Sequence, residues 1–375
     1  MDFDFSDEQK QLRDEARRFL ADKSPPAAVR AVLEGEAPYD RALWKQMGEM
    51  GFLGAAIAEE HGGSGLGYLE LCVIAEEAGR SLAAVPLSSS IYLAAEILKE
   101  AGTSEQKNAW LPLLASGERI ATVAVAEEVG RDALRYCNAR VAAGRLSGIK
   151  MPVADGMAAD LAIVLAQDEG GGGSLYLVDL HAPGIESRPV RSIDPTRPQA
   201  RVAFSAVEAE RLGDEGQGAS LVTRAYDRAA ILLAFEQVGG ADRALEMARD
   251  YALERMAFGR PIGGFQAIKH MLADMYVSAT LARSNAYYGA WALSEGAPEL
   301  PVAAPLARVS ATGAFQHCAR NNIQVHGGMG FTWEFDCHLY YRRSNALALA
   351  LGSQSTWENL LIGRMREHGN LAAAA

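Results

Sequence analysis

Two segments in the second half of the chain combine glycines with polar side chains at fixed spacing. The first runs from Arg255 to Gln266 and reads R-M-A-F-G-R-P-I-G-G-F-Q; the second runs from Gln324 to Thr332 and reads Q-V-H-G-G-M-G-F-T. In each, a helical pattern meets a short glycine-bearing stretch, where backbone can approach a ligand and side chains can address it. This combination predicts a binding site.

The first segment carries three side chains that suit a dinucleotide. The guanidinium of Arg255 matches a phosphate, the ring of Phe258 offers a flat apolar face, and Gln266 both donates and accepts hydrogen bonds. A dinucleotide site is one interpretation of this spacing. A helix-helix corner with solvated polar side chains is the other.

Other kinds of catalytic centre find no support in the sequence. The seven histidines do not pair with cysteines or carboxylates at the spacing of metal ligands, so we expect no metal site. The four cysteines show no C-x-x-C spacing and are expected to be reduced thiols, and no G-x-S-x-G segment occurs. Only His326, inside the second glycine segment, is a histidine of functional interest.

Taken together, R-x-x-F-G-x-P-I-x-x-F-Q and Q-x-H-G-G-x-G-F-T resemble the acyl-CoA dehydrogenase family, and the resemblance continues from the N-terminus to about Arg364. It implies an FAD-dependent enzyme in which a carboxylate removes a proton from the α-carbon of an acyl-CoA thioester while a hydride leaves the β-carbon for the flavin. It also implies an electron-transfer flavoprotein or a similar acceptor. Family members share FAD across a subunit interface, and the positions that match the neighbour-facing residues are Arg255, Phe258, Gln266, Gln324, Gly327 and Gly328.

The family's catalytic base has no counterpart at its two usual positions. Most members carry a glutamate directly before a glycine that matches Gly352, and Leu351 stands there in this chain. A minority carry the base on the helix before the R-x-x-F-G motif, at a position that matches Ala229; Ala230 then replaces an arginine used for CoA. Losing a general base costs about a hundred-fold to ten-thousand-fold in rate.

The positions that resemble the family's flavin-ring contacts have also changed. The run Val125 to Asp132 replaces the usual leucine-threonine-glutamate-proline segment and places Ala126 near the threonine. In the segment that resembles G-x-K-x-W-I-T, Pro152 replaces the tryptophan and Ala154 the threonine. Alanine cannot donate a hydroxyl hydrogen bond, and proline lacks the flat aromatic face.

Three interpretations follow. The chain is the base-lacking, β-type subunit of a heteromeric acyl-CoA dehydrogenase, which completes the FAD site of a related partner and acts in fatty acid or steroid side-chain degradation. Alternatively it is a homotetrameric acyl-CoA dehydrogenase with a relocated base, for which Glu236 is the candidate, although a structural glutamate is the simpler explanation. The third is a scaffold that binds FAD or an acyl group, or a flavin oxygenase, on the same fold.

The elements that must position these residues follow from periodicity. Apolar residues at helical spacing predict helices from Ser6, near Asp40, and over residues 68–80, 88–101, 105–116, 221–254, 265–295, 301–324 and 356–366. Short runs rich in Val, Ile and Leu predict strands at 120–126, 161–166, 174–180 and 201–204. We therefore expect a mainly α, α+β chain: a helical domain over residues 1–119, a β domain over 120–217, and a four-helix bundle over 218–375.

Composition excludes several classes of partner. The 375 residues carry a net charge of -11 without basic blocks, which argues against nucleic acid or an anionic membrane as a main partner. No apolar run reaches the length of a membrane span, and the acidic N-terminus does not resemble a signal peptide, so the cytoplasm is the expected location. Long bundle helices and a shared cofactor predict a tetramer, built as a dimer of dimers.

Overall fold

The computed structural model describes residues 5–35, 37–130 and 133–374 of the chain. The chain divides into two compact units. The bundle unit contains residues 1–29, 68–83 and 230–375, and the sheet unit contains residues 30–67 and 84–229. Helices precede and follow a middle set of strands, which confirms the predicted fold class. The division into three domains at residues 119 and 217 stays a prediction.

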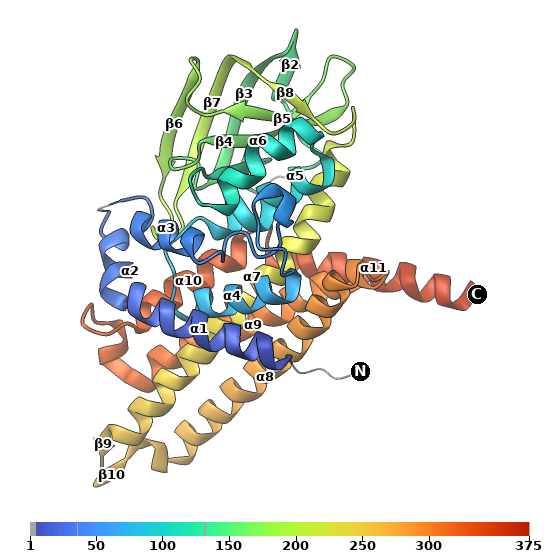
Figure 1. Ribbon diagram of the computed structural model, residues 1–375. Coiled ribbons are helices and arrows are strands. Elements are labelled where there is room, and N and C mark those ends of the chain that lie inside the picture. Colours follow the sequence, from blue (N-terminus) through green and yellow to red (C-terminus); the bar gives the residue numbers. More distant parts are fainter. Residues whose placement is uncertain (1–4, 36, 131–132, 375) are drawn as a thin grey trace. The chain divides into compact units, whose positions relative to one another are not determined.

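The helices and strands follow one another in a simple order (Figure 1). In the N-terminal third they are α1 (Asp7–Lys23), α2 (Pro26–Leu33), α3 (Arg41–Glu49), η1 (Glu59–His61), α4 (Tyr68–Arg80), η2 (Leu87–Ala95), α5 (Glu96–Ala101) and α6 (Ser104–Ala115). The strands are β1 (Ala121–Ala124), β2 (Arg140–Ala142), β3 (Arg145–Ala154), β4 (Leu161–Gln167), β5 (Gly173–Asp179), β6 (Ile185–Val190), β7 (Gln199–Glu208) and β8 (Glu210–Leu212). The C-terminal elements are α7 (Gly218–Glu254), β9 (Met256–Ala257), β10 (Arg260–Pro261), η3 (Ile262–Gly264), α8 (Gln266–Ser294), α9 (Leu300–His326), η4 (Gly327–Phe331), α10 (Cys337–Leu349) and α11 (Gln354–Ala374).

The sheet unit is built on one eight-stranded sheet. Its strands lie in the order β6-β7-β3-β2-β4-β5-β8, and β1 pairs in parallel with β4. Strand β4 is buried along nearly its whole length, as expected for a central strand covered on both faces. The hairpin from β4 to β5 places Val164 opposite Tyr176, and both side chains enter the apolar core of the unit.

Strand β3 is irregular where the sequence has a proline. Lys150 pairs with Val202 of β7 and Val153 pairs with Ala200, so the register shifts between them, at Met151 and Pro152. A proline has no N–H to give to the ladder and is therefore confined to edges and irregularities of a sheet. The residue that replaces the family's tryptophan thus lies in a bulge.

The bundle unit contains two long neighbouring helices, α8 and α9, which lie side by side in Figure 1. Within the same unit, α4 crosses the C-terminal part of α7 in backbone contact. A Cβ added at Gly79 would lie 1.9 Å from the backbone oxygen of Glu236, and one added at Gly239 would lie 1.9 Å from that of Glu76. Only glycine permits this approach.

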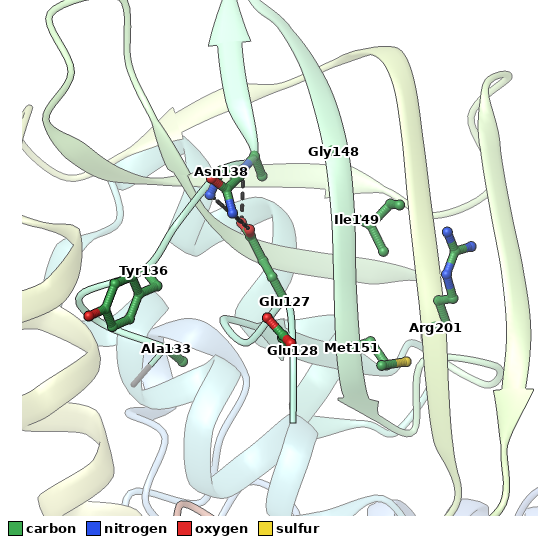
Figure 2. A pocket seen from close by; sticks show the side chains of 10 residues that line it. Glu127, Glu128, Ala133, Tyr136, Asn138, Gly148, Ile149, Met151 and Arg201 are labelled. Atoms are coloured by element: carbon green, nitrogen blue, oxygen red, sulfur yellow. Dashed lines mark hydrogen bonds between the residues drawn. The ribbon is translucent and has the colours of Figure 1, made fainter. Parts of the chain in front are cut away.

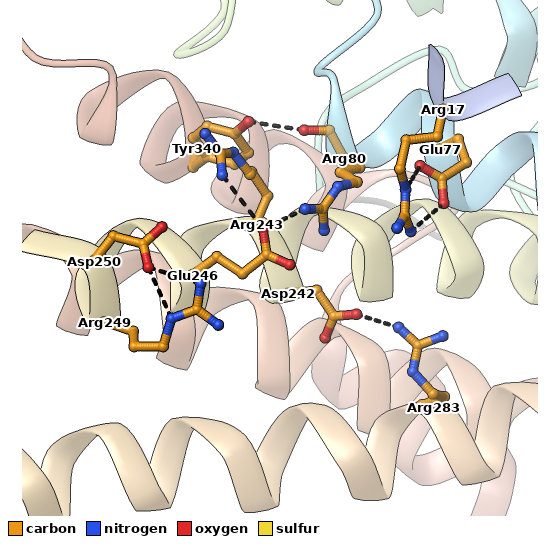
Figure 3. Close-up of polar contacts among 10 residues, drawn as sticks. All are labelled: Arg17, Glu77, Arg80, Asp242, Arg243, Glu246, Arg249, Asp250, Arg283 and Tyr340. Atoms are coloured by element: carbon orange, nitrogen blue, oxygen red, sulfur yellow. Dashed lines mark hydrogen bonds and ion pairs between the residues drawn. The ribbon is translucent and has the colours of Figure 1, made fainter. Parts of the chain in front are cut away.

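Arginines from two other helices, α1 and α8, pair with the acids buried at this crossing, and Figure 3 shows the pair of Arg17 with Glu77. Arg17 of α1 binds Glu77 through two hydrogen bonds of 3.0 and 2.8 Å, and Arg283 of α8 contacts Glu76 at 2.8 Å. Burial raises the pKa of Glu76, while Arg283 acts in the opposite direction. Carboxylates this deeply buried are tolerated because each has a charged partner.

The sequence-based assignment of elements missed several of them. Helices α2 and α10 and strands β2, β3, β6 and β8 were not predicted. Helix α10 escaped notice because its buried positions include His338, Arg343 and Ser344, which obscure an apolar stripe. The predicted helix over residues 88–101 exists as a π-helical segment, η2, followed by α5. In the described part of the chain, no helix combines the length and the apolar character that a membrane span requires.

Candidate functional site

The first glycine segment forms an exposed hairpin between α7 and α8. Arg255 follows the end of α7, β9 and β10 pair, and the N–H of Ile262 donates to the carbonyl of Arg255 at 2.8 Å. Phe258 lies at the tip with a φ of 51° and a side chain that is 96% exposed. A bulky residue at positive φ with a solvated ring is unfavourable in isolation, so this conformation indicates a functional constraint. Arg255 and Gln266 are exposed beside it.

The second glycine segment caps the end of α9. Gln324 is exposed in the last turn, and Gly327 leaves the helix with a φ of 60°. A Cβ added at Gly327 or at Gly328 would meet no atom within 4 Å. The space beside this backbone is therefore open to a ligand.

An aromatic contact brings the two segments together within the bundle unit. The ring of Tyr251, one turn before Arg255, stacks on His326 with centroids 4.1 Å apart, and Phe335 meets both rings edge-on. The Nδ1 atom of His326 lies 2.8 Å from the carbonyl oxygen of Asn322. Burial lowers the pKa of His326, so the ring is neutral near pH 7. This histidine therefore packs the two segments together.

The six residues Arg255, Phe258, Gln266, Gln324, Gly327 and Gly328 are called the hairpin surface below. All six are exposed to solvent. An arginine, two amides, an aromatic face and open glycine backbone suit a pyrophosphate and an attached aromatic base. The residues present therefore fit the adenine and pyrophosphate end of FAD.

Neither base position carries a group that can accept a proton. Ala229 of α7, at the first of these positions, is fully buried, as is Ala230, which replaces the arginine used for CoA. Leu351 follows α10 with a φ of 61°, and its carbonyl accepts a hydrogen bond from Nε1 of Trp357 at 3.2 Å. The backbone at Leu351 is thus held in a left-handed turn that presents an aliphatic side chain.

The candidate for a relocated base, Glu236, lies in the core of the bundle unit. Its side chain is fully buried, and its Oε1 atom is 3.5 Å from Nη1 of Arg343, which is 1% exposed. Arg343 also donates to the carbonyl of Leu82 at 3.1 Å. A second buried guanidinium, Arg308, bonds the neighbouring Gln237 at 2.7 Å. Burial lowers the pKa of Arg308 to about 10, and Glu236 acts in the opposite direction. These contacts support a structural ion pair.

The positions that resemble the flavin-ring contacts lie in the sheet unit. The N–H of Met151 donates to the carbonyl of Ala126 at 2.8 Å, which places Ala126 beside Pro152. A cavity of about 460 Å³ opens nearby, and Figure 2 shows Glu127, Glu128, Tyr136, Met151 and Arg201 among the residues that line it. Arg131 and Asp132 of the predicted run lie outside the described residues.

Glu127, a carboxylate that lines this cavity, is bound by groups of the protein itself. Glu127 accepts hydrogen bonds from the N–H groups of Asn138 and Ala139 and from Lys150, whose side chain is fully buried. Partial burial opposes ionisation, but these bonds prevail and lower the pKa of Glu127 to about 2. With alanine at positions 126 and 154, these residues do not fit a flavin ring that needs hydroxyl donors and an aromatic wall. Sequence reasoning missed Glu127, Lys150 and Arg201, because each reads alone as an ordinary charged residue.

Comparisons with known proteins agree with the family that the two motifs indicate. The model of the acyl-CoA dehydrogenase N-terminal domain matches residues 6–118, and that of the C-terminal domain matches residues 216–365. The chain is 32% identical over 348 residues to "Acyl-CoA dehydrogenase IpdE2" of Mycobacterium tuberculosis, covering 92% of this chain and 94% of that protein. A structure of a "Tcur3481-Tcur3483 steroid ACAD" variant is similar with a TM-score of 0.88 and 32% identity, over 97% of this chain and 99% of that one. The ChsE4-ChsE5 complex from Mycobacterium tuberculosis contains a chain with a TM-score of 0.87 and 27% identity, over 100% of both chains.

Proposed function

Because the chain belongs to the acyl-CoA dehydrogenase family, we propose that it is the subunit of a heteromeric acyl-CoA dehydrogenase that completes the FAD site of a related partner chain. FAD is the cofactor of this family, and its enzymes are oxidoreductases that act on CH-CH bonds. In the assembled enzyme, FAD would accept the hydride. This chain's hairpin surface would hold the adenine and pyrophosphate end of the FAD that the partner carries.

One asymmetry carries the proposal. All six residues of the hairpin surface have the types that a neighbour's FAD requires, and all are exposed. The chain's own base positions hold Leu351 and Ala229, and its own ring-side positions hold Ala126, Pro152 and Ala154. A chain that loses only the residues for its own flavin, and keeps those for a neighbour's, is suited to a partner with an intact site.

The contacts of Glu236 weigh against the relocated base. A general base must reach the proton that it abstracts and must be free to change its charge. Glu236 is fully buried beside Arg343, at the point where Gly79 of α4 contacts its backbone. A homotetramer that uses this carboxylate would have to open the core of the bundle unit.

The names of the similar proteins suggest which partners and substrates to test first. One is named a steroid ACAD and another is a complex of two named components, ChsE4 and ChsE5. We therefore propose a steroid-derived acyl-CoA as the first substrate to test, a related acyl-CoA dehydrogenase as the partner, and an electron-transfer flavoprotein as the acceptor. The assembly would be a tetramer in the cytoplasm.

The test is to produce the chain with and without a related chain that carries an intact base, then measure flavin absorbance and dye-coupled oxidation of acyl-CoA. We expect the isolated chain to be at least about a hundred-fold less active than the complex, because the complex alone contains a general base. Light scattering should show a joint tetramer. Robust turnover by the isolated chain, or no association with any candidate partner, would contradict the proposal.

A further inference from the structure

A cysteine and a lysine from neighbouring segments of the sheet unit meet beside Glu127. The Sγ atom of Cys137 lies 3.5 Å from Nζ of Lys150, and the same Nζ donates to Glu127 at 2.8 Å and to the carbonyl of Val125 at 3.0 Å. Three contacts therefore fix the amine of a fully buried lysine against a thiol.

Cys137 differs from the other three cysteines in its access to solvent. Cys72, Cys318 and Cys337 are buried, whereas Cys137 is half-buried. Burial raises the pKa of the Cys137 thiol, and the ammonium of Lys150 acts in the opposite direction. Because this sulfur is only half-buried, a small neutral oxidant can reach it, and Nζ of Lys150 lies 3.5 Å from it.

We propose that Cys137 and Lys150 form a modification site, at which hydrogen peroxide joins the two side chains through one bridging oxygen, as Lys-Nζ–O–Sγ-Cys. The site lies in the sheet unit and is independent of the proposed function. Its formation withdraws the lysine ammonium from Glu127, whose carboxylate holds the backbone of Asn138 and Ala139 beside the 460 Å³ cavity.

The reaction balances with two molecules of peroxide. One oxidises the thiol to a sulfenic acid and releases water. The lysine ammonium first loses a proton, and the neutral amine then attacks the second peroxide to give a hydroxylamine and water. The hydroxylamine oxygen then attacks the sulfenic sulfur and expels a third water. Sulfur and nitrogen each lose two electrons, the two peroxide O–O bonds break, and the released proton passes to solvent.

Peptide mapping tests the proposal. Trypsin cuts after Arg135, Arg140 and Arg145, so Cys137 and Lys150 fall in different peptides of the unmodified chain. After folded protein is treated with hydrogen peroxide, we expect the Cys137 peptide to be joined to a peptide that continues past Lys150, with a mass that exceeds the sum of those two peptides by one oxygen less two hydrogens. Cleavage after Lys150 should fail in the joined species, and dithiothreitol should separate the peptides again.

Two controls separate this bridge from ordinary thiol oxidation. Protein unfolded in urea before treatment should yield only sulfenic and sulfinic forms of Cys137, because nothing then holds the amine beside the sulfur. Lys150→Arg keeps a positive charge but lacks the primary amine, and it should give the same uncoupled products. If folded wild-type protein also yields oxidised Cys137 with normal cleavage after Lys150, the proposal is wrong.

Discussion

The hairpin surface of the bundle unit and the ring-side positions of the sheet unit differ in what their side chains are free to do. On the hairpin surface, Arg255 is exposed and Phe258 holds a strained, solvated conformation. At the ring-side positions, Ala126 and Ala154 have no polar atoms in their side chains, and the adjacent Glu127 is bound by four donors of its own chain. One region presents unsatisfied groups to a ligand, whereas the other satisfies its groups internally.

Under the proposed function, this difference divides one cofactor site between two chains. A group can bind a ligand only if its hydrogen bonds are not already made within the protein. Leaving such groups unbonded, or holding a residue in a strained conformation, lowers the stability of the free chain. The ring-side positions do not bear that cost, because they are apolar and the charged residues beside them, Glu127 and Lys150, pair with each other. The predictions below test whether the two regions differ as described.

The largest expected effect concerns Glu236. Glu236→Gln leaves Arg343 in the core without its anionic partner, so we expect the free energy of unfolding to fall by about 3–5 kcal/mol. Chemical denaturation measures this loss. In the assembled enzyme, kcat per folded complex should stay near the wild-type value. The double variant Glu236→Gln with Arg343→Met should recover part of the stability, because the guanidinium that Glu236 contacts is removed with it. A drop in kcat of about a hundred-fold without a loss of stability would instead identify Glu236 as the base.

A smaller effect is expected from the hairpin surface. Under the proposed function, Arg255→Ala or Gln324→Ala removes a hydrogen bond to the FAD of the partner. A charged bond of this kind is worth about 1.5–3 kcal/mol, so FAD retention should weaken about ten-fold or more. FAD released on dilution of the complex provides the measurement. Arg249→Ala is the matched control, because Arg249 is an exposed arginine of α7, shortly before Arg255, that pairs with Asp250. Equal FAD retention in Arg255→Ala and Arg249→Ala would show that the hairpin surface does not bind the cofactor.

The ion pair of Glu127 with Lys150 should make the free energy of unfolding depend on pH. The pKa of Glu127 is about 2 in the folded chain against an ordinary value of 4.5. The folded state therefore favours the charged form, and the contribution is present above pH 4.5 and lost as the pH falls toward 2. Glu127→Gln should be less stable than the wild type near pH 6, and the two unfolding curves should converge as the pH is lowered. Curves that stay parallel would mean that the carboxylate is not held as the structure indicates.

The smallest effect is expected at Leu351, where the family's base would stand. A φ of 61° is unfavourable for leucine but carries no steric penalty for glycine. Leu351→Gly should therefore raise the free energy of unfolding by up to about 1 kcal/mol. Leu281→Gly, at an exposed position within α8, should lower it by about 1 kcal/mol. Thermal unfolding of both variants gives the comparison. A loss of stability in Leu351→Gly would show that the leucine side chain contributes more packing than its backbone costs.

The sequence by itself determined the fold class, the family and the types of residue at each expected site position. Helical periodicity located α1, α4 and the long helices α7 to α9, because amphipathic patterns are local. The two glycine motifs are also local, so the residues of the hairpin surface were readable before any contact was known. The resemblance alone showed that Leu351 stands where most of the family carries its base, and that Ala126 stands near the position of the family's threonine.

Tertiary structure alone decided which charged residues are partners. Arg343 lies 107 positions from Glu236, and neither sequence segment contains a pattern that predicts the pair. The stacking of Tyr251 on His326 and the contact of Lys150 with Cys137 likewise join residues from separate elements. Burial and ion pairing depend on which surfaces pack together, and a single sequence encodes that only through the whole fold. For this reason Glu236 read as a possible base in the sequence, whereas its surroundings in the bundle unit support a structural role.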